Sequence, residues 1–325
     1  MKARILPWQH PRSWLALWLC LLASPSFAQI YTITDLGTLP GDSFSAATGI
    51  NSFGHVVGYG SHAFLWTKAH GMQDLGTLCT CGPSWASAIN DLGHVTGGSW
   101  INESDNGAFL WTPEEGMQQI VYVGDGQGGL AMNDFGEVGG STSVEPPEPF
   151  LWTKQGGEMN LGPLLGAVEG VVSGINDRRQ AVGFYIPVDT TQAYLWSEKS
   201  GVEDLGEGFA NAINFAGNVV GSNSANHAFL WTRQAGMKDL GTLPGDEVSS
   251  AAAINFFGEV VGTSGSRAFL WSPYAGMLDL NTLIPAGSGW TLSSATGINL
   301  SGQIVGNGTI NGQQHAFLLT WKGWR

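Results

Sequence analysis

The chain has 325 residues, of which 48 are glycine and 12% are charged, and its formal net charge is −13. Compared with average globular usage, glycine is about doubled and charge about halved, while 43% hydrophobic residues exclude a disordered chain. The absence of a Gly-X-Y period excludes collagen. An acidic chain with so few Lys and Arg residues is a poor candidate for binding nucleic acid or an anionic membrane surface.

Residues 1–28 match the pattern of a signal peptide. Three basic residues precede an apolar run from Trp14 to Ala23, and a small-residue segment ends at Ala28. The run is too short for a helix that spans a membrane. We therefore expect export to the periplasm or the extracellular space, with no membrane anchor after cleavage. Cleavage after Ala28 would remove the three cations and bring the charge to −16.

Two cysteines remain after the expected cleavage, Cys79 and Cys81, in a Cys-Thr-Cys segment. In an oxidising compartment they can form a disulfide that closes a very small ring. The alternative is two loop cysteines without consequence. Further metal ligands do not lie nearby in the sequence, so a zinc site is not indicated.

The rest of the chain consists of seven copies of one unit. Its first anchor is Ile-Asn-x-x-Gly-x-Val-Val-Gly, whose asparagine recurs at spacings of 39, 43, 43, 38, 41 and 44 residues. Two further anchors, Ala-Phe-Leu-Trp and Gly-Met-x-Asp-Leu-Gly-Thr-Leu, follow in most units. The seven asparagines are Asn51, Asn90, Asn133, Asn176, Asn214, Asn255 and Asn299.

Each unit predicts four short strands separated by turn signals. The Asn-x-x-Gly segment is typical of a hairpin in which Asn caps the turn and Gly takes a positive φ. Arg179 replaces this Gly in the fourth unit, which should strain the turn or change its type. Four strands in 38 to 44 residues are typical of a propeller blade. We therefore predict an all-β fold, a seven-bladed β-propeller with four-stranded blades.

The two ends of the repeat array predict a closed ring. The seventh unit stops near Trp321, after its third strand, while residues 31–39 match the fourth strand of the unit. The N-terminal strand can therefore complete the last blade and remove two exposed sheet edges. In this interpretation residues 29–325 form a single propeller domain.

The three anchors resemble those of the HAF-repeat family of extracellular repeat proteins. The family is named for the His-Ala-Phe tripeptide, which begins here at His62, His227 and His315. The resemblance covers residues 31–325. It implies an exported repeat protein and supplies no catalytic residues.

We interpret the repeated residues first as structural. The Trp of each Phe-Leu-Trp segment should pack between blades, and the Asp of Asp-Leu-Gly should cap the backbone. The three His residues fall on third strands of different blades, ~10 Å outward from the inner strand, so they cannot share a metal ion. The predicted inner strands contain no Asp, Glu, His, Lys, Arg or Cys. Any general acid, base or nucleophile would therefore have to come from loops.

The loops separate into two faces of the ring. The turns between strands one and two, and between three and four, are short and alike; we call this side the uniform face. The other loops differ in length and form the variable face, where we count eleven acids and one base, Arg267. Variable loops on a rigid scaffold often carry function. The predicted ligand-binding residues there are Asp42, Trp85, Trp100, Asp105, Asp125, Asp189, Asp246 and Trp290.

A simpler interpretation of these residues stays open. The acids can serve only to keep an exported protein soluble, and the three tryptophans can cover the edge of the core.

The function expected from the sequence is that of a non-enzymatic, exported binding module. Its partner would be a protein, a glycan or a cationic ligand bound at the variable face. We expect a monomer without a cofactor, except for loosely bound Ca²⁺. One alternative is a loop-built hydrolase or lyase acting on extracellular carbohydrate, and a second is a structural component of a surface or matrix.

Overall fold

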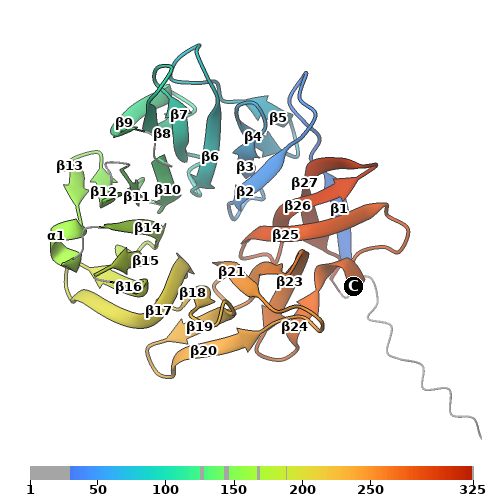
Figure 1. Ribbon diagram of the computed structural model, residues 1–325. Helices are drawn as coiled ribbons and strands as arrows, with labels where there is room; N and C mark the ends of the chain where they lie inside the picture. Colours follow the sequence, from blue (N-terminus) through green and yellow to red (C-terminus); the bar gives the residue numbers. More distant parts are fainter. Residues whose placement is uncertain (1–29, 125–127, 143–145, 167–168, 188, 324–325) are drawn as a thin grey trace, which may run out of the picture.

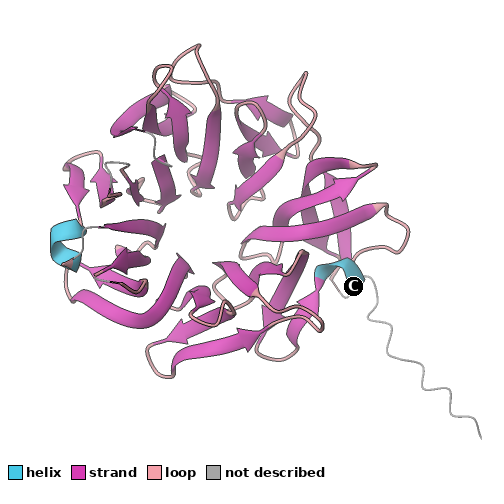
Figure 2. Ribbon diagram, viewed as in Figure 1, coloured by secondary structure: helices cyan, strands magenta, loops and turns pink. Residues whose placement is uncertain are grey.

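The computed structural model describes residues 30–124, 128–142, 146–166, 169–187 and 189–323. The predicted signal peptide, residues 1–28, lies outside this part of the chain. The described strands form six antiparallel sheets arranged in a ring (Figure 1). Figure 2 shows that the described part of the chain contains almost no helix. Its helical turns are α1 (Gly162–Leu165) and η1 (Leu280–Thr282). Neither is long and apolar enough to cross a membrane.

Four of the sheets consist of four strands that are consecutive in the chain. In each, the first strand lines the central channel and the fourth lies outermost. Their strands are β2 (Ala46–Ile50), β3 (Val56–Tyr59), β4 (Ala63–Thr67) and β5 (Gly71–Asp74); β6 (Ser84–Ile89), β7 (Val95–Trp100), β8 (Asn106–Thr112) and β9 (Gly116–Gly124); β10 (Gly128–Met132), β11 (Val138–Ser141), β12 (Pro149–Thr153) and β13 (Gly157–Asn160); and β21 (Ser249–Ile254), β22 (Val260–Ser264), β23 (Arg267–Ser272) and β24 (Gly276–Asp279).

One larger sheet contains seven strands because two blades share a strand. Residues 201–207 of β17 pair with β16, whereas residues 208–213 of β17 pair with β18. A loop was expected here from the repeat, but the spacing from Asn176 to Asn214 is the shortest in the chain and leaves no residues for one. The strands are β14 (Glu169–Ile175), β15 (Gln180–Ile186), β16 (Gln192–Ser197), β17 (Gly201–Ile213), β18 (Val219–Asn223), β19 (Ala228–Thr232) and β20 (Gly236–Gly241). Divided within β17, the described strands form seven four-stranded sets, numbered below as blades 1 to 7 from β2 onward.

The last sheet joins the two ends of the chain. Its order is β1 (Tyr31–Asp35), β27 (Gln313–Trp321), β26 (Ile304–Ile310) and β25 (Trp290–Ile298), and Tyr31 pairs with Trp321. Figure 1 shows β1, in blue, beside the red C-terminal strands. The N-terminal strand thus completes the final sheet, and the predicted β-propeller fold is confirmed.

The hydrophobic core lies between neighbouring blades. The phenylalanine of each Phe-Leu-Trp segment, or Tyr194 in its place, is almost completely buried. Phe64 and Trp66 of blade 1, for example, pack with Val305 and Leu318 of blade 7. Five of the six repeated tryptophans are buried and the sixth, Trp152, is half-buried, so the predicted packing of these side chains between blades is confirmed.

The glycine that ends Val-Val-Gly is required by this packing. A Cβ atom on Gly221 would lie 1.8 Å from the carbonyl oxygen of Phe209. In blade 1, a Cβ on Gly58 would meet both the Ala46 carbonyl oxygen, at 1.9 Å, and the ring of Phe64, at 2.8 Å. Any side chain here would therefore push the first strand and the buried aromatic ring away from the second strand.

A closed ring of hydrogen bonds connects the seven repeated asparagines. The Nδ2 of each donates to the backbone carbonyl oxygen of the asparagine in the next blade, at 3.0 to 3.4 Å. The last bond, from Asn299 to Asn51, closes the circle at 3.0 Å. The Oδ1 of Asn51 accepts from the backbone N–H groups of Phe53 and His55 in its own turn. These buried side chains therefore link neighbouring blades and also fix the conformation of the turns.

The turn that contains Arg179 keeps the geometry of the other turns. Its N–H donates to the Asn176 carbonyl at 3.0 Å, as that of Gly54 does to Asn51 at 3.1 Å. Arg179 takes a φ of 56°, in the left-handed region that Gly occupies in the other blades. Of the two expected outcomes, strain rather than a change of turn type is therefore correct.

Replacing Asn214 with Asp should destabilise the fold by about 2 kcal/mol or more. Asn214→Asp keeps the capping oxygen but removes the buried N–H donor and brings a charge near the Asn255 carbonyl. Urea unfolding measures the loss. The matched control is Asn311→Asp, an exposed turn residue, which should change stability by less than about 0.5 kcal/mol. Equal effects of the two substitutions would contradict a stabilising role of the asparagine ring.

Candidate functional site

The wall of the central channel is uncharged over the described residues that line it. It is built from the inner strands, and its side chains are small, polar or aliphatic, such as Thr48, Ser87, Ala131, Ala253 and Ile298. The channel itself therefore offers no acid, base or nucleophile from these strands.

A cavity of about 440 Å³ opens at the end of the channel on the uniform face. We call it the channel mouth. It is lined by the seven ring asparagines and by the residue that follows each of them. These following residues, in blade order, are Ser52, Asp91, Asp134, Asp177, Phe215, Phe256 and Leu300. One side of the mouth is therefore acidic, and the other is apolar.

The three acids of the mouth are held in place by the backbone of the preceding blade. The N–H of Ser52 donates to Asp91, that of Asp91 to Asp134, and that of Asp134 to Asp177, each at 2.8 Å to Oδ1. Among the described residues, no hydrogen bond is found to the second oxygen of any of these carboxylates. Three fixed carboxylates thus retain acceptors for a ligand that enters the mouth.

Asp134, the central acid, has a perturbed pKa. Partial burial raises the pKa of its carboxyl above the ordinary value, and the charges of Asp177 and Asp91 raise it further, against the lowering effect of the Asp91 amide. A basic side chain of a ligand beside these carboxylates would relieve this repulsion.

An apolar rim surrounds the channel mouth. We define it as seven large apolar side chains on the turns between first and second strands, each between 51% and 70% exposed. The fourth blade carries arginines instead, and the guanidinium of Arg178 lies 6.0 Å from the ring of Phe215. Several large apolar side chains exposed around one opening mark a binding site more often than a single exposed residue does. The rim consists of Phe53, Leu92, Phe135, Phe215, Phe256, Phe257 and Leu300.

The channel mouth was not predicted from the sequence, because function was expected on the variable face. No ligand-binding residue was predicted on the uniform face, where Asp91, Asp134 and Asp177 line the mouth. A signal was available: the residue after the anchor asparagine is acidic in three consecutive units and apolar in the last three.

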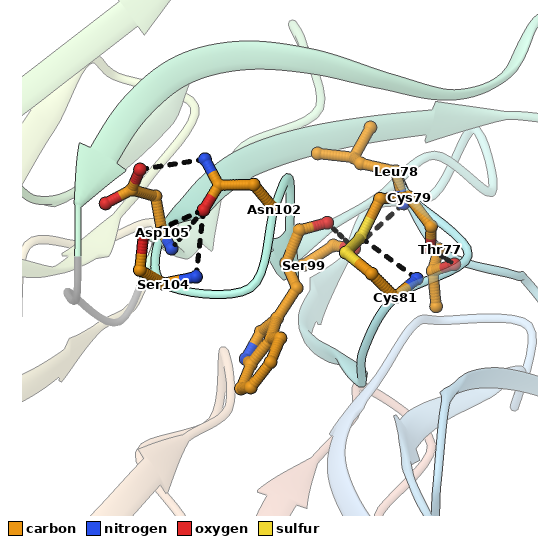
Figure 3. Close-up of a disulfide and its surroundings, with 9 residues drawn as sticks. Thr77, Leu78, Cys79, Cys81, Ser99, Asn102, Ser104 and Asp105 are labelled. Atoms are coloured by element: carbon orange, nitrogen blue, oxygen red, sulfur yellow. Dashed lines mark hydrogen bonds between the residues drawn. A yellow bond between two sulfur atoms is a disulfide. The ribbon is translucent and has the colours of Figure 1, made fainter.

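The predicted acidic residues of the variable face are distributed over several blades, and three of the five have hydrogen-bond partners within the protein. Asp42 accepts from the N–H and Oγ of Ser61 at 2.7 and 3.1 Å, and Asp246 accepts from Arg267 at 2.8 Å. Asp105 accepts from the Nδ2 of Asn102, as Figure 3 shows. Asp189 is exposed. Asp125 lies outside the described residues.

The three predicted tryptophans lie on strands at the edge of the core. Trp85 is half-buried on β6, and Trp100 ends β7 so close to Gly82 that a Cβ there would be 2.3 Å from the indole ring. Trp290 begins β25 and lies 6.0 Å from the ring of Phe317. This placement favours the simpler interpretation, in which they cover the core.

Cys79 and Cys81 are joined by a disulfide in the connection between blades 1 and 2 (Figure 3). Their Cα atoms are 5.3 Å apart. The N–H of Leu78 donates to the Oγ of Ser99 at 2.9 Å, which fixes the start of this connection to β7. The disulfide therefore constrains a loop that is already anchored to the second blade.

The histidines of the His-Ala-Phe tripeptides pair with the aspartates of the Asp-Leu-Gly anchor. His62 contacts Asp74, and His227 contacts Asp239, both at 2.9 Å. Asp74 also accepts the Gly76 N–H at 2.8 Å, so the predicted backbone cap is confirmed. Each histidine thus serves its own blade, and no group of three His, Cys, Asp or Glu side chains in the described part could hold a metal ion. Loosely bound Ca²⁺ stays a prediction.

Comparisons with known proteins support the fold. No protein-family model matches the chain, and no curated protein matches it. Among solved structures, virginiamycin B lyase from Staphylococcus aureus is similar, with a TM-score of 0.60, 9% identity and coverage of 89% of this chain and 99% of that one. A streptogramin B lyase has a TM-score of 0.59 at 8% identity, covering 90% and 99% of the two chains. YCF48 bound to D1 peptide has a TM-score of 0.53 at 9% identity, covering 90% and 96%. At these identities the likeness shows the fold alone.

Replacing Asp134 with Asn should make the protein slightly more stable at neutral pH. Because the folded carboxyl has a raised pKa, the native state loses stability as pH rises from the ordinary Asp pKa through the raised one. The amide removes this cost and can still accept the Asp91 N–H. The gain should be less than about 1 kcal/mol, since Asp134 is partly solvated.

Urea unfolding of both proteins at pH 7 and below pH ~4 measures this difference. The stabilisation should be present at pH 7 and vanish at the acidic end, where the native carboxyl is protonated. An equal difference in unfolding free energy at both pH values would contradict a raised pKa of the Asp134 carboxyl in the folded protein.

Proposed function

We propose that the protein is an exported, non-enzymatic binding module that holds a segment of a partner protein over the channel mouth. The observation that carries this proposal is the pairing of three fixed carboxylates with an apolar rim around one cavity. Export rests on the signal-peptide pattern of residues 1–28.

The chemistry of the mouth selects the kind of segment. Asp91, Asp134 and Asp177 attract Lys or Arg side chains, which would form charge-assisted hydrogen bonds with them. Phe256 and Phe257 offer exposed aromatic surface to apolar residues of the same segment. A peptide that combines basic and large apolar side chains fits both sides of the mouth. The net negative charge, −16 after the expected cleavage, would speed its approach at low salt.

The comparisons support this kind of partner loosely. One similar propeller is described as bound to a peptide and two others as lyases. A binding role agrees better with the uncharged channel wall, which lacks the side chains that acid–base catalysis needs. The acidic variable face is a second candidate surface, because Asp189 and Glu247 are exposed on it.

Selection from a displayed random peptide library on the immobilised protein tests the proposal. Enriched peptides should combine Lys or Arg with Phe, Leu or Trp. The triple variant Asp91→Asn, Asp134→Asn, Asp177→Asn should weaken binding of the synthetic peptide by about tenfold or more and reduce its salt dependence. Isothermal titration calorimetry at two salt concentrations measures both effects.

The matched control neutralises three exposed acids of the variable face, Glu103→Gln, Asp189→Asn and Glu247→Gln. It removes the same charge and should leave peptide affinity within about twofold. Loss of binding in the control with full binding in the mouth variant would move the site to the variable face and overturn the proposal.

A further inference from the structure

The Cys79–Cys81 disulfide (Figure 3) lies in a connection that the chain also builds twice without cysteine. Three connections begin at the glycine of an Asp-Leu-Gly anchor, and each reaches a buried serine eight residues later. In each, the Oγ of this serine donates to the carbonyl oxygen of the glycine at 2.6 Å. The three connections therefore have the same length and the same two ends. The pairs are Gly37 and Ser45, Gly76 and Ser84, and Gly241 and Ser249.

The three connections differ in the segment that follows Gly-Thr-Leu. Pro-Gly-Asp occupies it at residues 40–42 and 244–246, whereas Cys-Thr-Cys occupies it at residues 79–81. Where Pro-Gly-Asp is present, the N–H of the aspartate closes a turn onto the carbonyl oxygen of the preceding leucine at 3.0 Å. In the cysteine segment the N–H of Cys81 donates instead to the Sγ of Cys79, at 3.2 Å. The path of the chain between the two ends thus does not require a disulfide.

This disulfide also contributes little to the stability of the fold. A disulfide stabilises most when it closes a long loop, and here Thr80 alone separates the two cysteines. Hydrogen bonds to β7 already hold both flanks of the segment. The N–H of Leu78 donates to the Oγ of Ser99 at 2.9 Å. On the other side, the N–H of Trp100 donates to the carbonyl oxygen of Pro83 at 3.1 Å. A chemical role therefore explains the cysteine pair better than a structural one.

The two cysteines are placed differently for reaction with a thiol. Cys81 is exposed, whereas Cys79 is half-buried, so a thiolate of another molecule approaches Cys81 more easily. Attack on Cys81 makes the Sγ of Cys79 the leaving group, and the N–H of Cys81 already donates to this sulfur. A hydrogen bond to a thiolate favours its charged form, and a stabilised thiolate leaves faster. Exposed disulfides are also more easily reduced than buried structural ones.

We propose that Cys79 and Cys81 form a redox-active disulfide that oxidises pairs of thiols in a partner peptide or protein. A partner thiolate attacks the Sγ of Cys81, the bond between the two Sγ atoms breaks, and Cys79 leaves as a thiolate. The second partner thiolate then attacks the partner sulfur of this mixed disulfide and releases Cys81.

The exchange is balanced without a further reactant. The partner loses two electrons and gains a disulfide, while the two protons of its thiols end on Cys79 and Cys81. A low-molecular-weight disulfide such as oxidised glutathione restores the pair by the reverse exchange. This activity is separate from the peptide binding proposed at the channel mouth, because the connection between blades 1 and 2 belongs to the variable face.

A redox titration tests whether the pair is reactive. The full chain carries Cys20→Ser, so that Cys79 and Cys81 are its only cysteines. It is equilibrated without oxygen in buffers of reduced and oxidised glutathione, and alkylation followed by mass spectrometry counts the free thiols. The pair should be reduced and reoxidised reversibly across these buffers, whereas a structural disulfide resists reduction by glutathione. A pair that stays oxidised in excess reduced glutathione would overturn the proposal.

A second experiment separates this activity from a structural role. The oxidised protein should convert a synthetic peptide with two reduced cysteines to its disulfide, with one peptide disulfide formed per protein molecule. The matched control restores the repeat: Cys79→Pro, Thr80→Gly and Cys81→Asp together reproduce residues 40–42. This variant should keep the circular dichroism spectrum and thermal midpoint of the parent and lose the reaction. Marked destabilisation of the variant, or equal peptide oxidation by both proteins, would overturn the proposal.

Discussion

The closed ring of asparagine side-chain bonds is the constraint on which the rest of the structure depends. Each Nδ2 must reach the backbone of the next blade, and the circle closes only if Asn299 reaches Asn51. Each inner strand ends at the residue before its ring asparagine, and each asparagine is buried. A buried donor without its partner would cost far more than the bond itself contributes, so the seven turns are held in one common arrangement.

The ring of asparagines also determines which residues line the channel mouth on the uniform face. Once the asparagines form a circle, the residues that follow them necessarily line its opening, whatever their identity. Substitution at these positions does not alter the fold, because the backbone of the turn is fixed by the preceding Asn. The mouth can thus carry Asp134 beside Asp91 at a cost in stability, seen in the raised pKa of Asp134. The apolar rim likewise exposes side chains that a core would bury.

The repeat made the fold predictable from the sequence, whereas the channel mouth was not predicted, and ligand binding at the variable face stays a prediction. Strand positions, ring closure by residues 31–35 and the strain at Arg179 all follow from local patterns and repeat spacing. The pairing of His62 with Asp74 was missed because it joins neighbouring strands through side chains whose register the pattern does not specify. Asp42 and Asp246 were taken as ligand-binding residues, but whether a loop carboxylate is free or used depends on contacts with Ser61 and Arg267 that only the folded loop creates.

The residues that depart from the repeat differ in their cost to stability, which depends on how exposed they and their contacts are. A departure at an exposed position, such as Glu198, costs little and could be neutral. Arg179 is different, because a strained backbone persists only where surrounding contacts hold it, and here they lead to the buried Glu137. Val202 packs at the boundary between blades 3 and 4, at the position that methionine occupies in four other blades. Several acids of the variable face have hydrogen-bond partners within the protein, so fewer of their carboxylate oxygens remain for a ligand.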